Sequence, residues 1–122
     1  MLIKRFEDMK VWQDARILTK NIYDASNVGK FSKDFGLRDQ IQKASVSTMS
    51  NIVEGYERDS NKEFIKFLGY SKGSVGEVRS LLYVALDQGY LVEEKFNTLR
   101  SECFNISQQI SNFEKYLRKT TR

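Results

Sequence analysis

Apolar residues in the last third of the chain recur at alternating spacings of three and four positions. They are Phe96, Leu99, Cys103, Ile106, Ile110, Phe113 and Leu117. This heptad spacing places them along one side of an α-helix, as in helices that pack in bundles and coiled coils. Acidic residues begin the segment and basic residues end it, which suits the helix dipole. The pattern predicts a helix over about 93–119 whose apolar stripe needs partner helices.

Three earlier segments also show apolar residues at helical spacing, over about 8–27, 34–57 and 61–88. Asp8 is the predicted N-cap of the first helix, and Gly29 its stop. Ser60 and Glu63 form a predicted capping box at the start of the third, and Gly89 suits its C-terminal end. The chain has no proline, so no residue of this kind breaks these helices.

The four predicted helices are joined by short connections. Short loops make successive helices antiparallel, so we expect an up-down-up-down topology. A chain of 122 residues is of ordinary size for one domain. The sequence therefore predicts an all-α fold, an antiparallel up-down-up-down four-helix bundle, with residues 1–122 as a single domain.

The composition argues against several classes of function. The chain has no histidine, which excludes histidine-based triads and weakens any zinc site. The single cysteine, Cys103, falls on an apolar stripe and is interpreted as a small core residue. We expect no metal, no cofactor and no small-molecule substrate. No apolar run approaches the ~20 residues needed to span a bilayer, and the first residues lack a signal-peptide core, so a cytoplasmic protein is expected.

More large apolar residues are present than four core stripes require. Those lying partly off the stripes are Trp12, Tyr23, Met49, Val53, Tyr56, Phe67, Tyr70, Leu81, Tyr83 and Phe104. Some flank the core, and the surplus indicates a second apolar face. Such a face serves either an oligomer interface or a ligand groove. We favour a homo-oligomer, because aromatic side chains commonly anchor such interfaces.

Polar residues interrupt the second predicted helix at positions that share a face, namely Ser47, Asn51 and Glu54. One interpretation is a structural polar network with Tyr70, Ser71 or Ser74 of the third helix, which would fix helix register. The other is a polar pocket. Glycine is costly inside helices, so Gly55, Gly69, Gly73 and Gly76 predict close helix contacts.

The chain is mildly basic, with 20 Lys plus Arg against 16 Asp plus Glu and a net charge of +4. Each cation taken alone is an ordinary solvated side chain. Repeated around an oligomer, the cations could bind phosphate backbones. The candidate phosphate contacts are Arg16, Lys20, Arg38, Lys43, Arg58, Lys62, Lys66 and Arg79.

Several motifs together resemble one known family. Residues 6–13 read FEDMKVWQ, residues 36–41 read GLRDQI, residues 50–55 read SNIVEG, residues 63–68 read EFIKFL, and residues 89–91 read GYL. Gly73, Ser74 and Glu77 add to the pattern, as does Arg58 after the third motif. This combination resembles the four-helix-bundle proteins encoded in intervening sequences of bacterial 23S rRNA genes, over nearly the whole chain.

The resemblance implies an antiparallel four-helix bundle that assembles into a ring-like homopentamer. A related branch accompanies the reverse transcriptases of diversity-generating retroelements and binds nucleic acid and the polymerase through a basic surface. This chain departs from the family at three places. It lacks the usual prolines near Ser32 and at Met49, which predicts a straighter second helix, and Gln42 stands at one of two frequent arginines.

Three hypotheses follow. The first is a non-enzymatic, oligomeric bundle that binds RNA or a nucleoprotein through its basic residues. The second is a protein–protein adaptor with no nucleic-acid contact, in which the surplus aromatic residues meet a foreign partner. The third is an enzyme with a small ligand in a pocket around Asn51 and Glu54, which requires a cavity there.

Overall fold

The helices begin and end where local sequence signals predict, with one exception at the first helix. The computed structural model describes residues 3–120. Its elements are a short 3-10 helix η1 (Phe6–Asp8), α1 (Lys10–Ser26), a second 3-10 helix η2 (Phe31–Lys33), α2 (Phe35–Glu57), α3 (Asn61–Asp87) and α4 (Glu93–Lys119). No strand occurs within residues 3–120.

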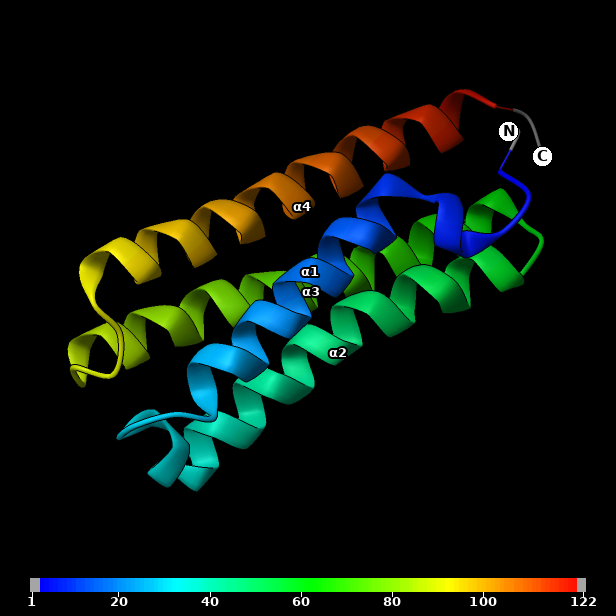
Figure 1. The fold of residues 1–122 in the computed structure, drawn as a ribbon. Coiled ribbons are helices and arrows are strands. Elements are labelled where there is room, and N and C mark those ends of the chain that lie inside the picture. Colours follow the sequence, from blue (N-terminus) through cyan, green and yellow to red (C-terminus); the bar gives the residue numbers. More distant parts are fainter. Residues whose placement is uncertain (1–2, 121–122) are drawn as a thin grey trace.

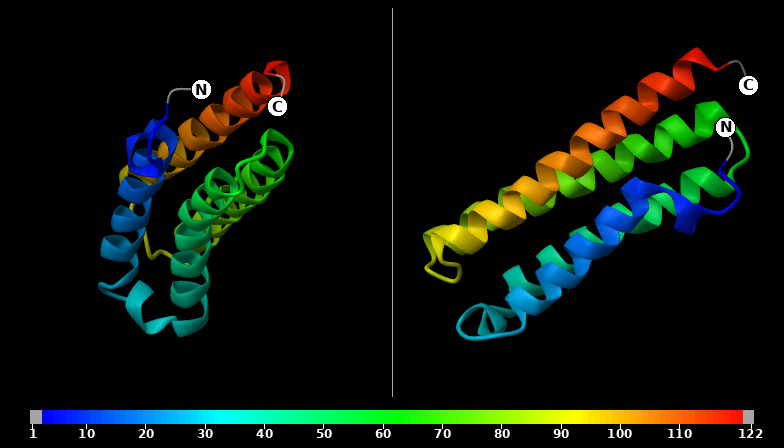
Figure 2. Two further views of the ribbon diagram at one scale, coloured as in Figure 1. Left: turned by 90° about the vertical axis from the view of Figure 1, so that its right-hand side faces the viewer. Right: turned by 45° about the horizontal axis from the view of Figure 1, so that its top comes forward.

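The four long helices pack as an antiparallel, up-down-up-down bundle, which confirms the predicted all-α fold (Figure 1). α1 packs on α2 and α4, and α3 packs on the same two helices, so α1 and α3 lie diagonally across the bundle. The two further views agree with this arrangement (Figure 2). The outward faces of α1 and α3 therefore point away from each other.

The core contains the predicted stripes. Ile41, Leu68, Leu82, Leu99 and Ile110 are fully buried, and Cys103 is buried beside them. The heptad stripe of α4 is buried except for Phe113, which is only partly covered. Burial of the apolar stripes is the main force that holds the helices together.

Half of the predicted capping box and the predicted glycine end are present at α3, and among the described residues no hydrogen bond joins the Ser60 amide to the Glu63 carboxylate. The hydroxyl of Ser60 accepts a hydrogen bond from the Glu63 amide at 3.3 Å. At the other end Gly89 adopts a φ of 76°, and the Tyr90 amide donates to the Ala85 carbonyl at 2.8 Å. This is the pattern of a glycine-terminated helix, because the left-handed conformation costs glycine little.

The prediction for the start of the first helix was wrong. Asp8 belongs to η1 and pairs with Arg5, while Met9 is extended and α1 begins at Lys10. Met9 is buried in the core, and the ring of Phe6 lies 5.1 Å from that of Trp12 in an edge-on contact. Packing of these apolar residues overrides the capping preference of Asp8.

The glycines of α2 and α3 differ in their surroundings. A Cβ at Gly55 would lie 2.8 Å from Cδ1 of Phe64, so α3 approaches α2 closely at this point. A Cβ at Gly73 or Gly76 would meet nothing within 4 Å, and one at Gly69 would make only an ordinary contact. The predicted close helix contact is therefore present at Gly55, and the prediction was wrong for the other three.

Candidate nucleic-acid interface

Part of the predicted polar network joins α2 to α3. The hydroxyls of Ser47 and Ser74 lie 3.0 Å apart, and the Asn51 amide donates to the Ser47 carbonyl at 3.0 Å and to its hydroxyl at 3.1 Å. Deeper in the interface the buried hydroxyl of Ser71 donates to the Thr48 carbonyl at 2.7 Å. These bonds satisfy polar groups between two tightly packed helices.

Glu54 and Tyr70 lie outside this cluster. Glu54 accepts a hydrogen bond from Arg58 at 2.8 Å on the exposed surface. Tyr70 is 50% exposed, and its ring contacts the edge of Phe67. Within residues 3–120 no hydrogen bond joins either residue to Ser47, Asn51 or Ser74. The network is therefore smaller than predicted, since both side chains point to the surface.

The structure gives no support to a ligand pocket around Asn51 and Glu54. Asn51 is hydrogen-bonded to Ser47, and Glu54 forms an ion pair with Arg58. A shallow hollow does lie nearby between α2 and α3, but neither residue lines it. Its lining is Gln40, Lys43, Ala44, Val46, Ser47, Ser50 and Glu77.

Three of the eight candidate phosphate contacts already have acidic partners. Lys20 pairs with Asp24 at 2.9 Å, Arg38 with Asp39 at 2.9 Å and Arg58 with Glu54 at 2.8 Å. The pairs of Lys20 and Arg58 are exposed, so each has a small effect on stability and can exchange partners, whereas Arg38 is partly buried. They reduce the positive potential available to a phosphate.

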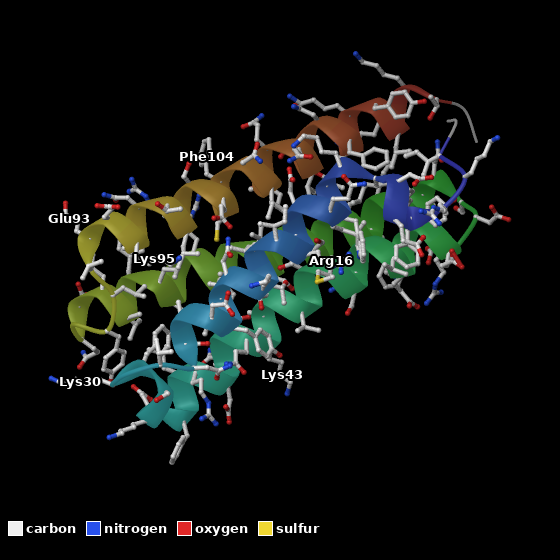
Figure 3. The ribbon with its side chains drawn as sticks, in the orientation of Figure 1. Arg16, Lys30, Lys43, Glu93, Lys95 and Phe104 are labelled. Atoms are coloured by element: carbon white, nitrogen blue, oxygen red, sulfur yellow. The ribbon has the colours of Figure 1, made fainter. Side chains whose placement is uncertain are left out.

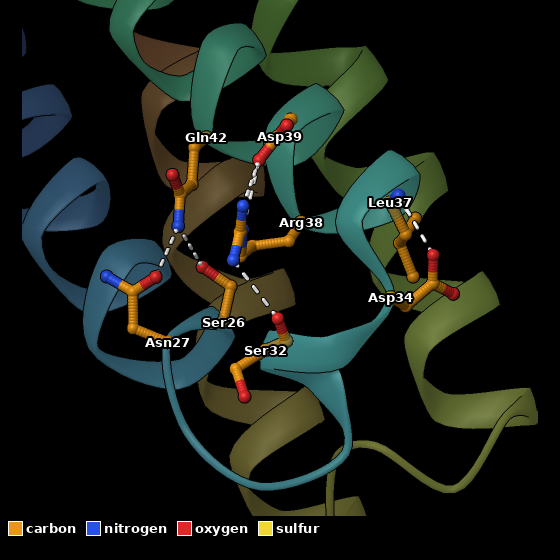
Figure 4. Close-up of polar contacts among 8 residues, drawn as sticks. All are labelled: Ser26, Asn27, Ser32, Asp34, Leu37, Arg38, Asp39 and Gln42. Carbon is orange, nitrogen blue, oxygen red and sulfur yellow. Dashed lines mark hydrogen bonds and ion pairs between the residues drawn. The ribbon is translucent and has the colours of Figure 1, made fainter.

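Arg38 has a local structural role in addition (Figure 4). Its guanidinium donates to the Ser32 carbonyl of η2 at 3.1 Å and to Asp39 at 3.0 Å. Close by, Gln42 donates to Ser26 at 2.9 Å and to Asn27 at 3.0 Å, which ties α2 to the end of α1. Arg38 is therefore largely committed to the connection between α1 and α2.

The other five candidates are exposed and have no acidic side chain at ion-pair distance among the described residues. They are Arg16 on α1, Lys43 on α2, and Lys62, Lys66 and Arg79 on α3. Arg16 and the three α3 residues lie on diagonally placed helices, so they do not form one continuous face in a single subunit. Lys43 lies on α2, and its side chain extends outward from that helix (Figure 3).

Arg58, which directly follows α2, and Lys66 of α3 lie around one aromatic ring. The guanidinium of Arg58 lies 4.8 Å from the ring centre of Phe67, and the ammonium of Lys66 lies 5.8 Å from it. Lys62 is one helical turn before Lys66 on the same side of α3. This corner of the bundle holds the highest density of the predicted contacts.

Sequence reasoning missed a second cluster, between α3 and α4. Arg79 and Tyr83 of α3 line a hollow with Arg100, Ser101 and Phe104 of α4. The Arg100 guanidinium donates to the Tyr83 hydroxyl at 3.4 Å. Arg100 and Phe104 stand four residues apart on one helix face, a spacing that could have pointed to the site. That Arg79 lies beside these two residues depends on how α3 packs against α4.

Cys103 lies in the core and is poorly suited to chemistry. Burial raises the pKa of its thiol to about 12, and the nearby Glu102 carboxylate adds to the shift. A thiol that is not ionised is a poor nucleophile and metal ligand.

Within residues 3–120 no group of three or more acidic or cysteine side chains is arranged to hold a metal ion. None of the helices of the described region is both long and apolar enough for a bilayer crossing.

Comparisons with known proteins agree with this fold. The fold is similar to that of a protein of unknown function from the S23 ribosomal protein family of Bacteroides thetaiotaomicron, with a TM-score of 0.78. The two chains are 19% identical, and the similarity covers 86% of this chain and 98% of the other. No curated protein matches the sequence. Residues 7–112 match the family described as 23S rRNA-intervening sequence protein. The chain belongs to this family of 23S rRNA-intervening sequence proteins.

Proposed function

We propose that this chain is a non-enzymatic RNA-binding subunit that contacts phosphates through its exposed cations. The observation that carries the proposal is that five of the eight candidate contacts are exposed and have no acidic side chain at ion-pair distance within residues 3–120. They are Arg16, Lys43, Lys62, Lys66 and Arg79. A lysine or arginine that is not already paired can exchange its counterions for phosphates at little cost. The link of the family name to 23S rRNA genes agrees with RNA as the partner.

We further propose that the chain acts as a homo-oligomer, a pentamer as the family resemblance implies. Large apolar side chains remain exposed on every long helix: Ile17 and Tyr23 on α1, Val46 on α2, Tyr70, Tyr83 and Val84 on α3, and Phe104 and Tyr116 on α4. An assembly would cover part of this surface and bring cations of different subunits together. Light scattering should give five times the chain mass of 14.2 kDa. A monomer at micromolar concentration contradicts this part of the proposal.

RNA binding is tested by titrating a fluorescent, structured fragment of rRNA with the full chain. Affinity should fall steeply as salt rises, because each neutralised phosphate releases counterions. Absence of binding at low salt, or binding that does not respond to salt, overturns the proposal.

The same exposed aromatic residues favour a second candidate, a protein–protein adaptor with no nucleic-acid contact. Tyrosine and phenylalanine are frequent anchors at protein interfaces. A partner protein that stays bound to the purified chain after complete nuclease digestion, together with a failed RNA titration, would favour the adaptor.

A further inference from the structure

We propose that the hollow between α3 and α4 binds one unpaired nucleotide of single-stranded RNA. The base would stack on Phe104 while Arg79 and Arg100 bind the adjoining phosphates. This inference rests on the proposed RNA binding and specifies which form of RNA this site takes. It assigns a role to residues on both walls of the hollow: Arg79, Tyr83, Arg100, Ser101 and Phe104.

The hollow is positively charged. Two guanidinium groups face it, and neither forms an ion pair within residues 3–120. The acidic residues adjacent in sequence are directed elsewhere. Glu77 accepts a hydrogen bond from Gln40 of α2 at 3.0 Å, and Glu102 accepts from Asn21 of α1 at 3.1 Å. The two positive charges are therefore available to an anion, and arginine suits phosphate because it can donate two parallel hydrogen bonds.

Two aromatic side chains, Tyr83 and Phe104, also line the hollow. Phe104 is 59% exposed, and its side chain extends from the outer side of α4 (Figure 3). Tyr83 is 45% exposed, and its ring lies 4.9 Å from that of the buried Phe96 in an edge-on contact. Arg100 also lies over Phe96, at 5.5 Å, and bonds the Tyr83 hydroxyl. Contacts to the core thus hold Tyr83 and Arg100 in place before a ligand arrives.

Size and chemistry together select an unpaired nucleotide. The hollow has a volume of about 500 Å³, within the usual range of pockets for small organic groups. Aromatic rings beside cations are how proteins bind single strands, since any exposed base can stack on such a ring. A base inside a duplex is already stacked and cannot reach Phe104.

A third cation, Lys72, lies further along the same two helices. The Lys72 ammonium donates to the Ser111 hydroxyl of α4 at 2.8 Å, which places it across the same two helices. It precedes Arg79 by two helical turns, a rise of about 10 Å along the axis. A single strand that continues from the hollow along α3 and α4 could therefore reach Lys72 with a neighbouring phosphate.

The experiment measures fluorescence anisotropy of labelled oligouridylate of twelve nucleotides with the full chain, and of a blunt RNA duplex as a second probe. Phe104→Ala should weaken single-strand binding about 5- to 100-fold, the usual effect of losing one stacked base. Phe104→Trp should restore it. The matched control is Tyr116→Ala, which removes another exposed aromatic ring from α4 and should leave the affinity unchanged.

The arms of the experiment separate two kinds of failure. Unchanged oligouridylate affinity in Phe104→Ala, with RNA binding otherwise intact, overturns this inference and leaves the proposed function standing. A wild-type chain that binds neither probe overturns both. If Phe104→Ala instead lowers the mass measured by light scattering, the hollow is a contact between copies of the chain, and the inference is overturned.

Discussion

At the residue scale, the tightest constraint among the glycines lies at Gly55, where α2 and α3 approach each other closely. A Cβ there would lie 2.8 Å from Cδ1 of Phe64 and 3.2 Å from its carbonyl oxygen. The backbone atom cannot move aside without displacing α3. Glycine at this position therefore sets the separation of the two helices that carry most of the candidate contacts.

Gly55→Ala should lower the free energy of unfolding by about 2 kcal/mol, since a methyl group overpacks a rigid interface. Gly73→Ala is the matched control. No atom lies within 4 Å of a Cβ at that position, and alanine should raise the free energy by about 0.5–1 kcal/mol through its higher helix propensity. Urea unfolding followed by circular dichroism measures both. Equal effects at the two positions would show that the close approach at Gly55 is not rigid.

Cys103 gives a second prediction at this scale. Its side chain is buried and the pKa of its thiol is raised to about 12, so the native protein should resist a thiol-specific aromatic disulfide at pH 8. Full labelling should appear only in denaturing urea, where burial ends and the thiolate forms. Labelling of the native protein at the rate of a free small thiol would contradict the buried position.

At the element scale, α1 is the shortest of the four long helices and depends on a polar tie to α4. The Asp14 carboxylate accepts hydrogen bonds from Lys10 at 2.6 Å and from Gln109 at 2.6 Å. Partial burial by itself would raise the pKa of Asp14, but these hydrogen bonds outweigh it and lower the pKa below its ordinary value. The folded state therefore favours the charged form of Asp14.

This shift predicts how stability depends on pH. A carboxyl whose pKa is lowered in the folded state stabilises the fold above its unfolded pKa of about 4. That contribution is lost as pH falls through the lower, folded pKa. Asp14→Asn should therefore lower the free energy of unfolding by about 1 kcal/mol at pH 7 and by progressively less below pH 4, as measured by urea unfolding.

The control is Asp24→Asn, which disrupts a more exposed pair with Lys20 and should change the free energy of unfolding by less than about 0.5 kcal/mol. A constant difference between Asp14→Asn and wild type from pH 7 to pH 2 would contradict this account.

The same scale shows which parts of the fold could be predicted from the sequence. Heptad spacing and caps such as Ser60 and Gly89 act within one helix, so they located α3 and α4 closely. The predicted N-cap at Asp8 was wrong because the burial of Met9, which involves other helices, determines where α1 begins. Local signals predict elements well, and they fail where tertiary packing opposes them.

The candidate site was less predictable for a related reason. Candidate cations could be named from composition, but their pairing depends on side chains from other turns and helices, as with Arg58 and Glu54. The spacing of Arg100 and Phe104 indicates only the α4 side of the second hollow, because Arg79 and Tyr83 reach it from α3 and their position depends on how the two helices pack. Similarly, Glu54 lies on the same helix as Asn51, but its side chain bonds Arg58 at the surface and does not join the predicted network.

At the scale of the whole molecule, the exposed cations lie on more than one side of the bundle. Arg16 lies on α1 and Lys66 on α3, and these two helices lie diagonally across the bundle (Figure 2). One subunit therefore offers several small basic areas. If the proposed function is right, RNA affinity depends on the unpaired cations at particular positions and not on net charge alone.

The most direct test compares two variants that lose the same charge. One carries Lys43→Gln, Lys62→Gln and Lys66→Gln, which removes cations that have no ion pair within residues 3–120. The other carries Arg5→Gln, Lys10→Gln and Lys20→Gln, which removes cations already held in ion pairs. Affinity for the rRNA fragment is measured for each from 50 to 300 mM salt. The first variant should lose about two to three units of slope in a plot of log affinity against log salt, and the second less than about one. Equal losses in the two variants would contradict the account.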